Sequence, residues 1–63
     1  MNVKQAVEFL WRSGFRANAS TTFPNEVVVL DPVIVMSGSE RWTEYKRVTL
    51  RPDQVTRFVL ARS

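Results

Sequence analysis

The chain contains no cysteine and no histidine, and it has only 2 glycines among its 63 residues. Without cysteine it forms no disulfide bond and no thiolate zinc site. Without histidine it lacks the commonest general base near neutral pH, which excludes Ser-His-Asp and Cys-His catalytic sites. The two glycines, Gly14 and Gly38, are too far apart to form a glycine-rich phosphate loop. We therefore expect a non-enzymatic protein with no metal and no cofactor.

Long hydrophobic runs are also missing. A membrane-spanning helix needs about 20 apolar residues, and the longest apolar run, residues 27–36, is interrupted by Asp31 and Pro32. At the N-terminus, Glu8 and Arg12 interrupt any stretch that resembles the apolar region of a signal peptide. The sequence predicts a cytoplasmic protein that does not interact with membranes.

What the chain has is a globular composition, with 44% hydrophobic and 24% charged residues. We expect a single domain over residues 1–63. A chain of this length buries only about 60% of its unfolded surface, so its core is marginal. Because disulfides and thiolate metal sites are excluded, a partner subunit is the remaining common way to stabilise it. The net charge of +3 comes from basic residues scattered along the chain.

Two segments have the spacing of helices. Over residues 3–13, apolar residues recur on one stripe at Val3, Ala6, Val7, Leu10 and Trp11. Asn2 and Gln5 predict a capping box before this stripe, and Gly14 is suited to the left-handed position that ends a helix. A second helix is predicted over residues 52–62, where Pro52 suits the first turn.

The clearest pattern is a β-hairpin. Residues 26–36 and 41–51 are two runs of equal length, rich in β-formers, on either side of the loop Ser37-Gly38-Ser39-Glu40. Symmetric pairing about this loop puts Val27 opposite Leu50 and Val35 opposite Trp42. Proline donates no hydrogen bond to a strand ladder, so we expect Asp31-Pro32 to disturb the ideal register and Pro32 to lie at a sheet edge or in a bulge. Residues 15–20 alternate as a short edge strand or an extended linker would.

These elements predict a small two-layer α+β domain with the order α-β-β-β-α, or α-β-β-α if residues 15–20 form no strand. Its long antiparallel hairpin (26–36/41–51) is covered on one face by the N- and C-terminal helices. The predicted core is Val3, Val7, Leu10, Trp11, Phe15, Val27, Val29, Val48, Leu50, Val55, Phe58 and Val59.

The second face of the hairpin is more apolar than a solvated sheet face should be. Helices on both faces would explain this, as would a bulge that turns Ile34 and Met36 into the core. Our main hypothesis is instead a protein interface, since large exposed apolar patches mark interaction sites. A homodimer is the simplest partner, and another protein is the alternative. The predicted interface residues are Val28, Leu30, Ile34, Met36, Trp42 and Tyr45.

A second hypothesis is a nucleic-acid-binding accessory protein. Tyr45, Lys46, Arg47 and Arg51 form the densest basic segment and include an aromatic residue that could stack on bases. The competing interpretation is that these charges keep an exposed hairpin soluble.

The order α-β-β-β-α resembles that of double-stranded-RNA-binding domains and of small HicA-type toxins. The catalytic histidine of the HicA type has no counterpart, since this chain contains none. The lysine-rich start of the last helix in RNA-binding members is replaced here by Arg51-Pro52-Asp53-Gln54. The resemblance therefore covers the order of elements and assigns neither function.

Overall fold

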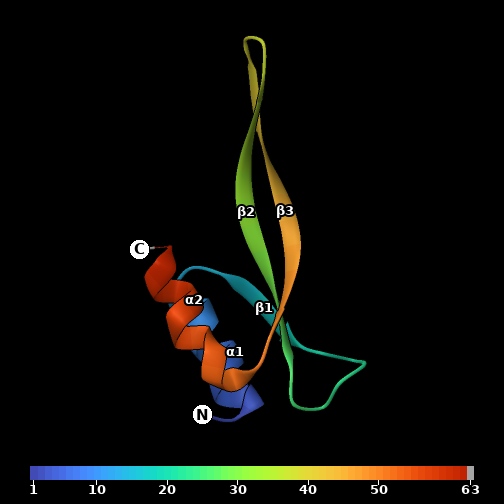
Figure 1. The fold of residues 1–63 in the computed structure, drawn as a ribbon, viewed down its shortest axis with the longest axis vertical. Coiled ribbons are helices and arrows are strands. Elements are labelled where there is room, and N and C mark those ends of the chain that lie inside the picture. The colour runs from blue at the N-terminus through green and yellow to red at the C-terminus, as the bar shows by residue number, and fades with distance from the viewer. Residues whose placement is uncertain (63) are drawn as a thin grey trace.

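A computed structural model describes residues 1–62. It contains two helices and a three-stranded antiparallel sheet in the order α-β-β-β-α, which confirms the predicted α+β fold (Figure 1). The sheet order is β1-β2-β3, and a 3₁₀ turn, η1, precedes the last helix. Along the chain the elements are α1 (Val3–Arg12), β1 (Arg16–Ala19), β2 (Val27–Ser37), β3 (Glu40–Leu50), η1 (Pro52–Gln54) and α2 (Val55–Ala61). No helix within residues 1–62 is long and apolar enough to cross a bilayer.

Helix α1 begins and ends as its sequence predicts. The Asn2 side chain accepts a 2.8 Å hydrogen bond from the Gln5 amide, and the Gln5 side chain accepts one of 3.0 Å from the Asn2 amide. At the other end Gly14 has a φ of 92°, and the Phe15 amide donates to the Leu10 carbonyl. This is the Schellman arrangement, and it turns the chain directly into β1.

Both helices pack on the same face of the sheet. The buried core is Ala6, Leu10, Ala17, Val27, Val29, Val55 and Phe58. The Phe15 ring meets the Phe58 ring edge-on at 5.3 Å, which ties the start of β1 to α2. The alternative with helices on opposite faces is therefore wrong.

One predicted core residue, Trp11, lies at the surface instead of in the core. Its side chain is 54% exposed, and its indole N–H donates a 2.8 Å hydrogen bond to the Ala17 carbonyl. An indole N–H needs such a partner, which Trp11 finds on the edge strand rather than in the apolar centre. Ala6 and Ala17 occupy that centre instead.

The hairpin register follows the prediction, including Val27 opposite Leu50 and Val35 opposite Trp42. The turn is tighter than expected: β2 reaches Ser37 and β3 starts at Glu40. Gly38 has a φ of 61°, and within residues 1–62 only the two glycines have a positive φ, which fits a two-residue type II′ turn.

Of the two predicted places for Pro32, an edge or a bulge, the structure has the edge: pairing with β3 runs without interruption from Val27 to Ser37, and β1 pairs only with residues 27–30. A two-residue turn makes its flanking pair a hydrogen-bonded one, and hydrogen-bonded pairs alternate with the other kind along the ladder. Pro32 and Tyr45 then form a non-hydrogen-bonded pair, so the ladder between β2 and β3 requires no N–H donor at Pro32. Its nitrogen faces the side where β1 has already ended, since β1 pairs only with residues 27–30.

Beyond β1 the hairpin continues alone as a twisted two-stranded ribbon that projects from the helices and β1 (Figure 1). We call residues 31–46 the arm. The arm makes the molecule elongated, with extents of 43 × 25 × 15 Å. The radius of gyration is 13.0 Å, against about 11 Å for a compact chain of this length.

Candidate protein-interaction site

The strand register defines two faces of the sheet. The outer face is the one opposite the helices, and it consists of Arg16, Asn18, Val28, Leu30, Pro32, Ile34, Met36, Arg41, Thr43, Tyr45, Arg47 and Thr49. Five of the six predicted interface residues lie on it: Val28, Leu30, Ile34, Met36 and Tyr45. Trp42 lies on the opposite side of the arm, across from Val35. The arm therefore has apolar residues on both faces.

The apolar side chains of the arm are open to solvent. Ile34 is 61% exposed, Met36 71%, Tyr45 62% and Trp42 41%. The alternative in which a bulge turns Ile34 and Met36 into the core is thus wrong. An isolated two-stranded hairpin is marginally stable at best in water, so this arm lacks the cover that such a ribbon needs.

Closer to the helices, the outer face is hollowed around Leu30. Leu30 sits between Arg16 on β1 and Arg47 on β3 in one row across the sheet. A hollow of about 290 Å³ extends from this row over Val28. A second hollow, of about 220 Å³, lies between Arg16, Leu30 and Tyr45. The outer face thus combines an apolar floor with a basic rim.

Charge is sorted between the two sides of the sheet. Within the three described strands, the outer face carries Arg16, Arg41 and Arg47 and no acidic residue. The inner arm face is the other side of the arm, and it consists of Asp31, Val33, Val35, Ser37, Glu40, Trp42, Glu44 and Lys46. All the acidic residues of the three strands are on this side. Alternation along β3 would have predicted the position of Arg41, which the sequence analysis did not single out.

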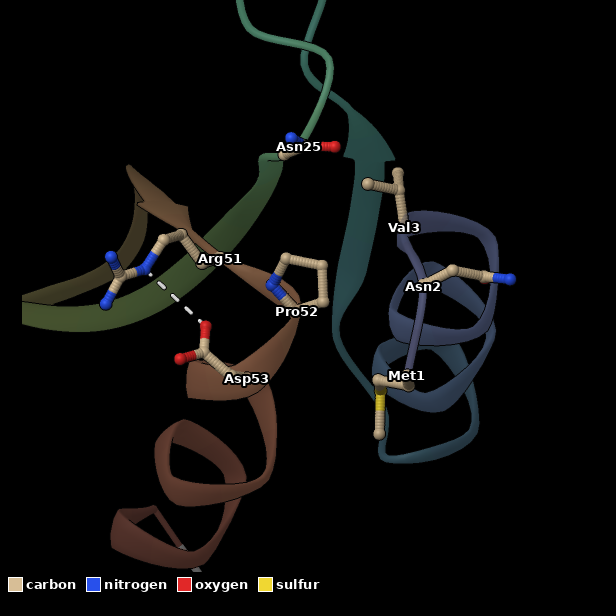
Figure 2. A pocket seen from close by; sticks show the side chains of 7 residues that line it. All are labelled: Met1, Asn2, Val3, Asn25, Arg51, Pro52 and Asp53. Atoms are coloured by element: carbon tan, nitrogen blue, oxygen red, sulfur yellow. Dashed lines mark ion pairs between the residues drawn. The ribbon is translucent and has the colours of Figure 1, made fainter.

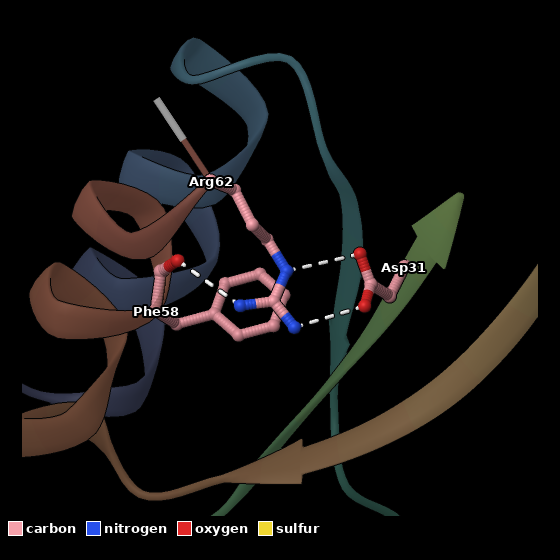
Figure 3. Close-up of polar contacts among 3 residues, drawn as sticks. All are labelled: Asp31, Phe58 and Arg62. Carbon is pink, nitrogen blue, oxygen red and sulfur yellow. Dashed lines mark hydrogen bonds and ion pairs between the residues drawn. The ribbon is translucent and has the colours of Figure 1, made fainter. Parts of the chain in front are cut away.

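Asp31 is held at the base of the arm by Arg62, as Figure 3 shows. Arg62 donates from Nε to Oδ1 at 3.0 Å and from Nη2 to Oδ2 at 2.9 Å. Its guanidinium carbon lies 3.7 Å from the centre of the Phe58 ring. The hydrogen bonds from Arg62 lower the pKa of Asp31, against a smaller opposing effect of burial. No sequence pattern links these residues, which are 31 positions apart.

The four predicted nucleic-acid contacts do not form one surface. Tyr45 and Arg47 share the outer face, whereas Lys46 projects from the other side, across from Asp31. Arg51 follows β3, and its Nε lies 3.5 Å from Oδ1 of Asp53. The acidic partner partly neutralises Arg51, and the strand pairing places only Tyr45 and Arg47 of these four residues on the outer face.

A further hollow of about 360 Å³ lies between the start of α1 and η1. Figure 2 shows Met1 and Asn2 on one side of it, Pro52 and the Arg51–Asp53 pair on the other, and Asn25 from the loop before β2. The capping box already occupies the side-chain groups at the start of α1. Within residues 1–62 no three acidic side chains gather as metal ligands would.

The fold and this surface define a small α+β domain with a projecting β-hairpin arm. Comparison of the chain with protein-family models, curated proteins and solved structures finds no match.

Proposed function

We propose that this protein is a non-enzymatic interaction module that associates with a second copy of itself through the outer face of its hairpin. The observation that carries the proposal is the arm, which exposes Ile34, Met36, Tyr45 and Trp42 beyond the part of β2 that β1 pairs with. Contiguous apolar surface of this kind is typical of protein interaction sites.

The total surface area supports the same proposal. The chain exposes 4972 Å², whereas a compact monomer of 7.3 kDa exposes about 4,200 Å². The excess is about 800 Å², which is the area that each partner contributes to a standard protein interface. Association through the arm would lower the exposed area of each copy to about that of a compact protein of the same mass.

Nucleic-acid binding has less support. Lys46 lies on the other side of the sheet from Tyr45 and Arg47, and Arg51 lies beyond the end of β3 in an ion pair with Asp53. The arm is also not basic, since Arg41 and Lys46 are offset by Asp31, Glu40 and Glu44. A ribbon that enters a nucleic-acid groove would need an excess of positive charge along its length.

The test is the oligomeric state of the protein by sedimentation velocity over a concentration series. We expect a dimer for the native chain and a monomer for Ile34→Lys, because the lysine places a charge at the centre of the apolar outer face. Thr56→Lys, on an exposed position of α2, is the matched control and should leave the dimer unchanged. A native chain that remains monomeric at high concentration would show that the proposal is wrong.

A further inference from the structure

We propose, resting on the function above, that the outer face of one copy binds the inner arm face of a second copy, so that the two copies exchange arms. The alternative dimer would stack two outer faces on each other. That arrangement brings the three arginines of each copy, Arg16, Arg41 and Arg47, together with no acidic residue from either sheet between them. Like charges brought together at an interface disfavour association.

The inner arm face supplies the missing negative charge. Within residues 1–62, neither Glu40 nor Glu44 has a salt-bridge partner. The indole N–H of Trp42 donates to Oε1 of Glu44 at 3.1 Å, so an apolar ring and a carboxylate lie side by side. Asp31, the third acidic residue of this face, is already bound by Arg62. Within the described residues, Glu40 and Glu44 are thus two carboxylates without a cationic partner, and they complement the arginines of the outer face.

The apolar parts of the two faces are complementary as well. The floor of the outer hollow is Val28 and Leu30, between Arg16 and Arg47. The inner arm face offers Val35 and Trp42 directly opposite each other, with Glu40 and Glu44 close by on the same strand as Trp42. Each face thus has an apolar centre, with Arg16 and Arg47 beside that of the outer face and Glu40 and Glu44 beside that of the inner arm face.

The reach of the arm and the symmetry agree with the exchange. From residue 31 to residue 38 the arm spans about 23 Å at about 3.3 Å per residue, which is close to the 25 Å width of the molecule. In a twofold dimer each copy supplies both faces, so the same contact forms twice.

Charge reversal tests the exchange. Glu40→Lys/Glu44→Lys makes both faces basic, and Arg16→Glu/Arg47→Glu makes both acidic. We expect each double variant alone to dimerise at least tenfold more weakly than the native chain. An equimolar mixture of the two should form a heterodimer, because each basic face then meets an acidic one. Glu8→Lys/Glu26→Lys, which changes the charge equally but away from the arm, is the control and should dimerise normally.

The outcomes separate the two proposals. If Glu40→Lys/Glu44→Lys dimerises like the native chain while Ile34→Lys does not, the outer faces stack on each other. The exchange is then wrong and the proposed function stands. A mixture without heterodimer also overturns the exchange. Circular dichroism of each variant is the control that checks its folding. A monomeric native chain overturns the proposed function itself.

Discussion

At the scale of single residues, the ion pair between Asp31 and Arg62 sets how the arm meets the helices. Arg62 lies over the Phe58 ring and donates two hydrogen bonds to the Asp31 carboxylate. It therefore links the end of α2 to the point where β2 extends past β1. The planar guanidinium makes both hydrogen bonds at once, which an ammonium group does not.

We predict that Asp31→Asn lowers the melting temperature at pH 7. Hydrogen bonds from Arg62 hold the pKa of Asp31 below its ordinary value of 3.8, so the ionised form stabilises the fold above that value. The contribution is lost as the pH falls through the lowered pKa of the folded state. Thermal unfolding at several pH values should therefore show a gap between native and variant that closes in acid. Arg62→Lys, which keeps the charge and loses the fork, should give an intermediate melting temperature. A gap that is the same at every pH would contradict this account.

Trp11 shows why some residue positions were not predictable. Helical spacing places Trp11 on the apolar stripe, but the same spacing also includes Ala6. Which of them lies at the centre depends on the close approach of α1 to the small Ala17 on β1. That contact belongs to the tertiary structure, and the periodicity of one helix does not contain it.

At the scale of elements, the hairpin register was predictable because two runs of equal length surround a glycine-containing loop. The place of Pro32, at an edge or in a bulge, could not be decided from the sequence, because it depends on where β1 ends. β1 itself, predicted over residues 15–20, occupies Arg16–Ala19. Its short length decides that only residues 27–30 of β2 have a neighbour on that side.

The turn at the tip gives a prediction for the arm as an element. Gly38 has a φ of 61° and nothing lies within 4 Å of a Cβ added there, so Gly38→Ala introduces strain without a clash. A strain of about 1 kcal/mol would loosen the arm and weaken dimerisation about fivefold. Ser39→Ala, at the neighbouring turn position, should leave the dissociation constant unchanged. Equal dissociation constants for the two variants would show that the turn does not order the arm for binding.

At the scale of the whole molecule, the sequence predicted an uncovered apolar face, and the structure places it on an arm that stands apart from the helices. What the sequence analysis missed is the sorting of charge, with arginines on the outer face and Glu40 and Glu44 on the other side of the arm. That sorting follows from alternation, but its significance depends on both sides of the arm being open.

An open arm predicts that amide hydrogen exchange depends on protein concentration. In dilute monomer the amides of residues 33–43 should exchange rapidly, because a two-stranded ribbon with few buried contacts opens easily. Amides of α1 and of residues 27–30 should be protected at every concentration, since both lie against the core. As the dimer forms, exchange in the arm should slow while that in the core stays constant. Ile34→Lys should abolish this concentration dependence, and an arm that is already protected in dilute native protein would mean that the ribbon needs no partner.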